Sequence, residues 1–218
     1  MLGVWNLEFV GREKSYLHGG LCSPLGVEEV ARLTMDRQQA LDLLESHMKA
    51  DNLRKHCLAT EAIMRALAER FDEPIDLWGI AGLLHDLDYE ETADSPSEHG
   101  LKTAAILADS DLPTETIGAI KAHNAEVLGL ERQSKLDFAL TCAESITGMV
   151  IATTLVYPDK RLQSVKPKSI LKRMKQKDFA RRVNREQIRL CEEIGVPLED
   201  FAELSLRAMQ GISDQLGL

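Results

Sequence analysis

Apolar residues recur with the 3.6-residue period of an α-helix along most of this chain, and the two-residue alternation of a β-strand is nearly absent. In residues 36–50, Leu44 and Met48 lie on one stripe, and Asp36 stands where a helix N-cap belongs. Residues 75–87 are apolar on nearly every side, which is typical of a helix buried all round. The pattern therefore predicts an all-α protein.

Cap residues and helix breakers divide the chain into a series of helices. Ser134 and Asn184 are placed as N-caps, and residues 157–159 and 195–197 interrupt the periodicity. The predicted helices cover residues 36–50, 52–71, 75–87, 98–109, 113–125, 134–156, 168–182, 184–194 and 198–216.

Residues 1–34 differ from the rest of the chain because they are rich in glycine and irregular in pattern. Met35 opens the well-patterned region. We interpret residues 1–34 as an N-terminal extension of uncertain status, either an appended element or the product of an upstream start. Residues 35–218 are then expected to form a single helical domain.

Composition narrows the class of protein. The hydrophobic share of 44% and the charged share of 28% are ordinary for a soluble globular chain. A net charge of −9 argues against a protein that coats nucleic acid. No apolar run approaches the ~20 residues of a membrane span, and the four cysteines form no CxxC pair. We therefore expect a cytoplasmic protein without a membrane partner.

Four of the six histidines lie on the interior faces of separate predicted helices, each beside a carboxylate or an apolar patch. A single histidine on an apolar stripe is more often a packed core residue than a ligand. The dipeptide His85-Asp86 is harder to explain in this way, because burying a charged Asp costs several kcal/mol unless it is paired or metal-bound. Neighbouring helices would have to supply the remaining ligands. Mixed imidazole and carboxylate ligands suit Mn, Fe, Co, Ni or Zn better than Mg.

Five motifs follow one another in the order KHCLA, GLLHDLDYE, EHGLKTAAIL, KAHNAE and CAESITG. In this order they resemble the HD superfamily of metal-dependent phosphohydrolases, and in particular its small stand-alone HDIG-type predicted hydrolases. The resemblance covers roughly residues 36–210, including SILKRMKQKDFARRVNREQI. It implies an HD-domain helical bundle, with an HD core at about residues 50–157 and extra C-terminal helices at 165–218.

The resemblance also implies a ligand set for one or two divalent transition metal ions. His56, His85 and Asp86 match the core ligands of the superfamily. His99 and His123 match the extra histidines that two-metal members such as the HD-GYP phosphodiesterases use.

The last family ligand is normally Asp, but this chain has Glu144 in that place. Glutamate still ligates, although its extra methylene shifts the carboxylate. Asp137, two turns earlier on the same face, is a weaker substitute.

Residues next to these motifs are candidates for further roles. Asp86 is the expected bridging or water-orienting group. Asp88 either assists proton transfer or is a solvated carboxylate at a helix end, and the second explanation is the commoner. Lys55, Lys102 and Lys121 adjoin the motifs and are candidate contacts for substrate phosphate.

A basic run extends from Lys166 to Arg185, with nine cationic residues and one acid. It is either a phosphate-facing lid, a local nucleic-acid patch, or a solvated helix that balances an acidic surface. We favour the solvated helix.

Three functions fit these observations. The first is a phosphohydrolase that acts on a small phosphorylated molecule or nucleotide through metal-activated water. The second is a di-iron oxygenase of the same fold, and the third is a non-catalytic binding module whose site has degenerated. The sequence argues against nucleic acid as a partner and leaves a homo-oligomer open.

Overall fold

The computed structural model describes residues 35–218, and within that range every regular element is a helix. The predicted all-α fold is therefore confirmed. The proposed N-terminal extension, residues 1–34, lies outside the described residues. In chain order the helices are α1 (Arg37–His47), α2 (Asp51–Phe71), α3 (Ile75–Leu84), α4 (Tyr89–Thr92), α5 (Leu101–Ile106), α6 (Thr114–Ala122), α7 (Ala125–Leu128), α8 (Lys135–Leu155), η1 (Leu162–Ser164), α9 (Pro167–Met174), α10 (Arg185–Arg189), η2 (Leu190–Glu192), α11 (Leu198–Gly211) and α12 (Ser213–Leu216).

Side-chain caps begin three of these helices where the sequence predicts them. Asp36 accepts a hydrogen bond from the Gln39 N–H at 2.8 Å, and Gln39 returns one to the Asp36 N–H at 2.9 Å. Ser134 and Asp137 form the same reciprocal capping box before α8. Asn184 caps α10. Because each cap satisfies N–H groups that have no partner within the helix, the helix starts are fixed locally.

Several predicted helices are longer than the helices observed. The predicted helix 98–109 begins only at Leu101, because Gly100 has a left-handed φ of 81°. The predicted helix 168–182 ends at Met174, and turns fill the chain up to Asn184. The predicted helix 198–216 is broken at Ile212, where φ is −120°.

The predicted helix 75–87 is also too long, and this difference affects the site. Helix α3 ends at Leu84, and residues 85–88 form turns. His85 and Asp86 therefore project from a helix terminus and the turn that follows it. Neighbouring positions within an α-helix point about 100° apart, but this angle does not apply to His85 and Asp86.

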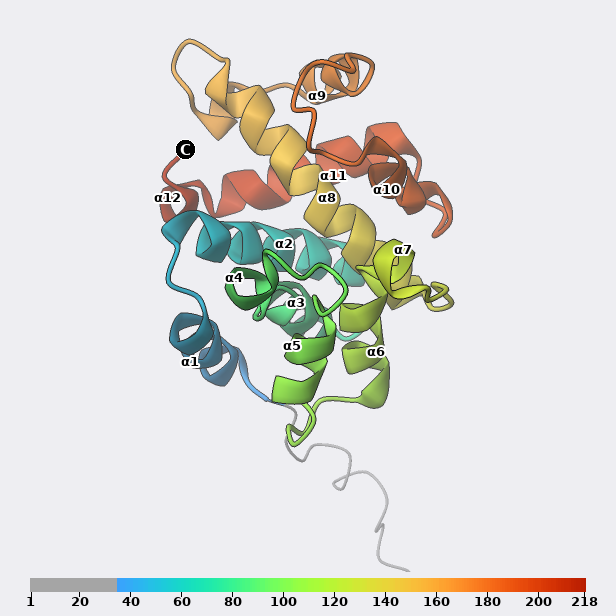
Figure 1. Cartoon of the computed structure of the whole chain (residues 1–218). Helices are drawn as coiled ribbons and strands as arrows, with labels where there is room; N and C mark the ends of the chain where they lie inside the picture. The colour runs from blue at the N-terminus through green and yellow to red at the C-terminus, as the bar shows by residue number, and fades with distance from the viewer. Residues whose placement is uncertain (1–34) are drawn as a thin grey trace, which may run out of the picture. The chain divides into compact units, whose positions relative to one another are not determined.

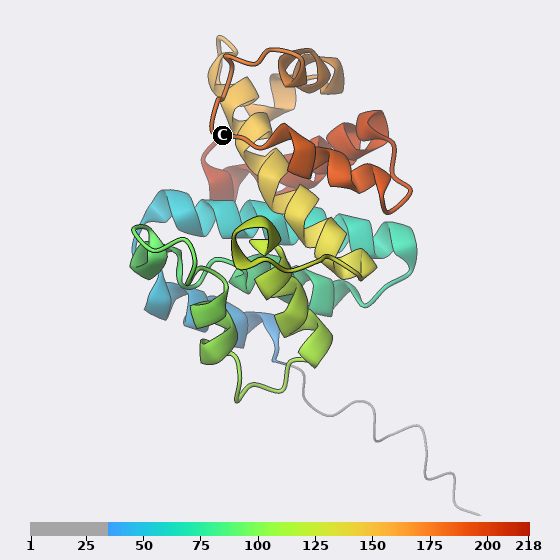
Figure 2. The same cartoon turned by 45° about the vertical axis from the view of Figure 1, so that its right-hand side comes forward.

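Helix α2 is the centre of the domain. It contacts α3, α8 and α11, and Figures 1 and 2 show α8 crossing it obliquely. Helices α2 and α3 approach closely because α3 carries glycine at position 82, where an added Cβ would lie 3.0 Å from the backbone of Glu61. This approach brings the end of α3 alongside α2.

Helix α8 is long and apolar enough to cross a membrane by length and composition. However, 67% of its apolar window is buried inside the domain. That burial is consistent with the core helix of a soluble protein. Helix α8 runs from the capped Ser134 end towards the site.

We predict that Gly82→Ala destabilises the fold by about 1–3 kcal/mol, because the new methyl group would overpack the contact between α2 and α3. Gly118→Ala in α6 is the matched control, since its Cβ would meet nothing within 4 Å. In the control, the free energy of unfolding should rise by about 0.4–1 kcal/mol. Urea unfolding measures both, and equal stability of the two variants would contradict the close approach of α2 and α3.

Candidate metal centre

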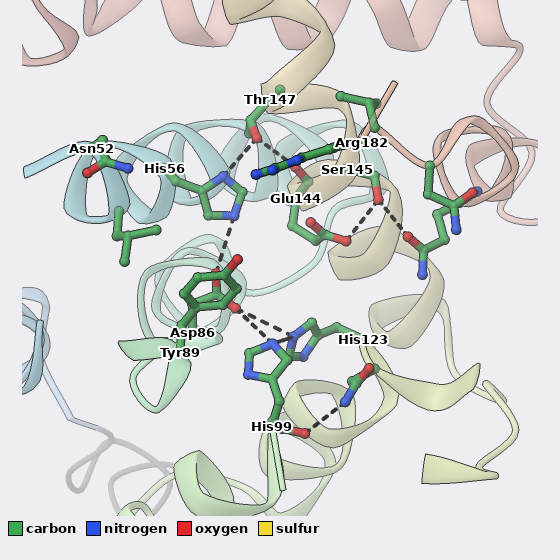
Figure 3. Close-up of a pocket in the computed structure, with 16 residues that line it drawn as sticks. Asn52, His56, Asp86, Tyr89, His99, His123, Glu144, Ser145, Thr147 and Arg182 are labelled. Atoms are coloured by element: carbon green, nitrogen blue, oxygen red, sulfur yellow. Dashed lines mark hydrogen bonds and ion pairs between the residues drawn. The ribbon is translucent and has the colours of Figure 1, made fainter. Parts of the chain in front are cut away.

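Separate segments of the chain bring five candidate ligands to one place. One histidine lies on α2, a His-Asp pair lies in the turn after α3, another histidine precedes α5, and the last one follows α6. Figure 3 shows several of these side chains pointing towards a common centre. The five residues are His56, His85, Asp86, His99 and His123.

The five residues form two groups of three that share Asp86. His56 and His85 belong to the first group, and His99 and His123 belong to the second. Within each group the ligand atoms all lie within 4.8 Å of one another. Asp86 Oδ1 lies 3.4 Å from His85 Nε2 and 3.3 Å from His99 Nε2, while Oδ2 lies 3.6 Å from His56 Nε2. The carboxylate thus faces both groups.

Backbone carbonyls fix the orientation of two of the imidazoles. His85 Nδ1 lies 2.8 Å from the Gly82 carbonyl oxygen, and His123 Nδ1 contacts the Ile120 carbonyl oxygen. A carbonyl oxygen only accepts hydrogen bonds, so each Nδ1 carries the proton. The Nε2 lone pairs of both rings are then directed at the centre, as in metal-binding histidines.

A buried carboxylate orients the third ring. Asp88 Oδ1 accepts a hydrogen bond from His99 Nδ1 at 2.8 Å, and Oδ2 accepts from the N–H groups of Gly100 at 2.8 Å and Thr103 at 2.9 Å. Burial raises the pKa of Asp88, but the hydrogen bonds from His99 and Thr103 outweigh it and lower that pKa overall. The interpretation of Asp88 as a solvated carboxylate is therefore wrong, since its side chain is 0% exposed. Asp88 acts as a positioning residue for His99.

A hydroxyl group orients the fourth ring. Thr147 Oγ1 donates to the carbonyl oxygen of Glu144 at 2.6 Å and lies 2.9 Å from His56 Nδ1. Since the hydroxyl has only one proton, it accepts from His56 Nδ1–H. His56 Nε2 is left free towards the centre, as are the Nε2 atoms of His85 and His123.

The donor set fits divalent cations. His56 Nε2 lies 3.2 Å from His85 Nε2, and His99 Nε2 lies 2.9 Å from His123 Nε2. Two imidazole lone pairs at this distance repel each other unless a positive charge lies between them. Four such nitrogens around one carboxylate match the ligands that transition metal ions prefer.

The electrostatics of the cluster agree with this fit. Burial raises the pKa of Asp86, but the surrounding histidines, His85 first, hold it well below its usual range. Burial lowers the pKa of His85 to about 3, so the ring stays neutral. Burial also lowers the pKa of His99, but Asp86 and Asp88 outweigh it and raise the value to about 10. The cluster therefore favours a positive charge beside Asp86.

The expected sixth ligand is not gathered with the others. Glu144 lines the same pocket but belongs to neither donor group, and its carboxylate accepts a hydrogen bond from Ser145 Oγ at 2.8 Å. Burial raises the pKa of Glu144, and the nearby His56 and His123 oppose that rise. Asp137 is occupied in the capping box of α8.

The structure places the three predicted phosphate-contacting lysines away from the pocket wall. Lys55 and Lys102 each pair with a carboxylate one helical turn away, at 2.9 Å in both cases, and Lys121 is not on the wall either. Among residues 35–218, Arg182 is the arginine or lysine side chain that lines the pocket. Sequence reasoning missed Arg182, and the basic run from Lys166 to Arg185 was the signal that pointed to it.

The pocket itself has a volume of about 480 Å³ and opens to solvent. Polar side chains dominate the wall beyond the candidate ligands. They are Asn52, Tyr89, Asn124, Ser145, Thr147, Arg182, Asn184 and Gln187.

The family model described as the HD domain matches residues 53–149, a little under half of the chain. The matched segment contains all five candidate ligands, and it confirms the resemblance inferred from the five motifs. Comparison with the curated proteins found no match, and comparison with the solved structures found none.

We predict that Asp88→Asn weakens cation binding at the group of Asp86, His99 and His123. An amide has one acceptor oxygen, so it cannot serve both His99 and the two backbone N–H groups that Asp88 now satisfies. Loss of such an orienting partner typically reduces metal affinity by about 10- to 100-fold. Calorimetric titration of the metal-free protein with Zn²⁺ or Mn²⁺ measures the effect.

Thr147→Val is the matched control, because it removes the hydrogen-bond partner of His56 and leaves Asp88 intact. This variant should weaken cation binding at the group of His56, His85 and Asp86 by a similar factor. If both variants weakened the same binding step, the division into two groups would be wrong.

Proposed function

We propose that this chain, which carries an HD domain over residues 53–149, is a metal-dependent phosphohydrolase of small phosphoesters or nucleotides. The observation that carries the proposal is the pair of donor groups that share Asp86 at the floor of an open pocket. Four oriented imidazole rings around one buried carboxylate are better explained by a metal site than by packing alone. The HD superfamily supplies the reaction class, because its members are usually metal-dependent hydrolases.

Divalent cations held by these groups would lower the pKa of a bound water towards ~7 and polarise a phosphoryl oxygen. The protein residues supply position and electrostatics. Asp86 directs Oδ1 at histidines of both groups and Oδ2 at His56. Asp88 and Thr147 fix the rings of His99 and His56. The pocket would thus hold a phosphate group and a nucleophilic water in one fixed geometry.

The shape and lining of the pocket support a small substrate. Its volume of about 480 Å³ lies in the range of small-molecule sites. Asn52, Asn124 and Gln187 on the wall offer hydrogen bonds to the part of the substrate that does not react. The net charge of −9 disfavours a polyanionic nucleic acid.

Glu144 is proposed as a supplementary ligand. To join the donor groups, its side chain would have to turn from Ser145 towards Asp86. The metal ions that suit the set are Mn, Fe, Co, Ni or Zn, because the donors are mainly imidazole nitrogens.

We predict that purified protein contains one or two equivalents of a transition metal and releases phosphate from a panel of phosphoesters under anaerobic conditions. Asp86→Ala removes the shared ligand, so metal content and phosphate release should both fall to background. His47→Ala, which alters a histidine on α1 outside the site, is the matched control and should retain both. Elemental analysis and a colorimetric phosphate assay measure the outcomes.

Two results would redirect the assignment. A shared carboxylate between two histidine pairs also suits a di-iron centre, so iron with oxygen consumption and no phosphate release would identify the oxygenase. Stoichiometric metal without turnover of either kind would identify a binding module.

We also predict that Glu144→Asp retains or increases metal binding, because it restores the carboxylate length that is normal in the superfamily. Zn²⁺ or Mn²⁺ titration against wild type measures the change. Loss of metal by this variant alone would show that Glu144 is not a substitute for the family Asp.

A further inference from the structure

The chain between α9 and α10, which we call the Arg182 loop (residues 175–184), forms part of the pocket wall. It consists of turns, and Ala180 has a left-handed φ of 45°. A non-glycine residue in this conformation is strained and needs support from its surroundings. In Figure 3 the Arg182 side chain extends over the pocket on the side where His56 and Glu144 lie.

The guanidinium of Arg185, the first residue of α10, stabilises the loop through hydrogen bonds to its backbone. It donates to the backbone carbonyl oxygens of Val183 at 2.9 Å, Gln176 at 3.0 Å, Ala180 at 3.4 Å, and Phe179. No carboxylate within residues 35–218 pairs with Arg185. Both of its Nη atoms are therefore committed to the loop backbone, while Nε is buried without a partner among the described residues, and these Nη contacts explain how the strained Ala180 is maintained.

A second set of contacts holds the loop against α8. Val183 packs over Gly148, where an added Cβ would lie 3.0 Å from Val183 Cγ2. Just beyond the loop, Gln187 Oε1 lies 3.1 Å from Ser145 Oγ. Because Gly148 and Ser145 flank the part of α8 that carries Thr147, the loop has a fixed position relative to the metal centre.

Arg182 differs from its neighbour on the same loop. Arg181 pairs with Asp178 at 3.4 Å and is 77% exposed, away from the pocket. Arg182 is also exposed, but it lines the pocket and forms no ion pair within the described part of the chain. A guanidinium that is free of protein carboxylates and held beside a phosphate site matches two phosphate oxygens at once.

We propose that Arg182 binds the phosphate group of the substrate, and that Arg185 and Gly148 are positioning residues that set its place over the metal centre. This inference rests on the proposed phosphohydrolase function, and it names the side chain that recognises the anion. It also assigns a role to the basic run, which we interpreted as a solvated helix.

The test uses the full-length, metal-loaded protein, with inorganic phosphate as the binding probe and p-nitrophenyl phosphate as the substrate. Arg182→Ala should raise the Kd for phosphate and the KM by about 10- to 100-fold, as expected for the loss of one charge-assisted hydrogen-bonded pair. Metal content should not change. Arg182→Lys retains the charge without the planar fork and should recover part of the loss.

Arg181→Ala is the matched control, because it removes the same charge from the adjacent residue outside the pocket. Its Kd for phosphate and its KM should both stay within twofold of the wild-type values. If Arg182→Ala behaved like Arg181→Ala, or if metal-loaded wild type bound no phosphate, the inference would be overturned.

Gly148→Ala tests the positioning role. Its methyl group would push Val183 outwards by a few tenths of an ångström, which should raise KM several-fold with metal content unchanged. In the Arg182→Ala background the same substitution should have no further effect on KM, because it acts through Arg182. Equal effects in both backgrounds would show that Gly148 does not act through Arg182, and they would overturn its assignment as a positioning residue.

The two proposals fail in different ways. Arg182-dependent phosphate binding without hydrolysis of any phosphoester would contradict the phosphohydrolase and leave Arg182 as the anion-binding residue. Hydrolysis that is indifferent to Arg182→Ala would retain the phosphohydrolase and remove Arg182 from it.

Discussion

The site depends on the burial of one carboxylate, Asp86, whose side chain is only 8% exposed. Removing a carboxylate from water costs several kcal/mol unless positive or hydrogen-bonding groups surround it. Here the positive group is His99, whose pKa is raised to about 10 and whose Nε2 lies 3.3 Å from Asp86 Oδ1, and each of the four rings has its Nδ1 engaged by an acceptor. These Nδ1 contacts orient the four Nε2 atoms around Asp86, and a cation held there would further stabilise the carboxylate.

Helix ends provide two of those acceptors. The last carbonyl groups of a helix have no partner within it. The carbonyl oxygens of Gly82 near the end of α3 and Ile120 near the end of α6 accept from the imidazole three residues further on, His85 and His123. Two helix termini are thus capped by the rings that they orient. A change that extended either helix would remove the acceptor and turn the ring away from Asp86.

The sequence predicts the helices and the ligands better than it predicts their surroundings. Periodicity and cap residues locate α1, α2 and α8 closely, because both signals are local. Motif order identifies the two donor groups. Periodicity does not register the end of α3 at Leu84, since the apolar run continues beyond it. It also leaves open the burial of Asp88, which depends on contacts with Gly100 and Thr103 from another segment.

Adjacency to a ligand in the sequence does not place a residue on the pocket wall, as Lys55 shows. It precedes His56 on α2, and neighbouring helical residues point about 100° apart, so Lys55 is directed away from the pocket. Arg182 reaches the pocket from a loop whose course depends on Arg185 and Gly148. No local pattern encodes such a position.

Ser145 connects the ligand side of the pocket to the loop side. Its Oγ lies 2.8 Å from Glu144 Oε1 and 3.1 Å from Gln187 Oε1. A hydroxyl has one proton, so Ser145 donates fully to only one of these oxygens at a time. Whichever oxygen receives the proton, the other is left without this donor, so the two sides of the pocket compete for one hydrogen bond.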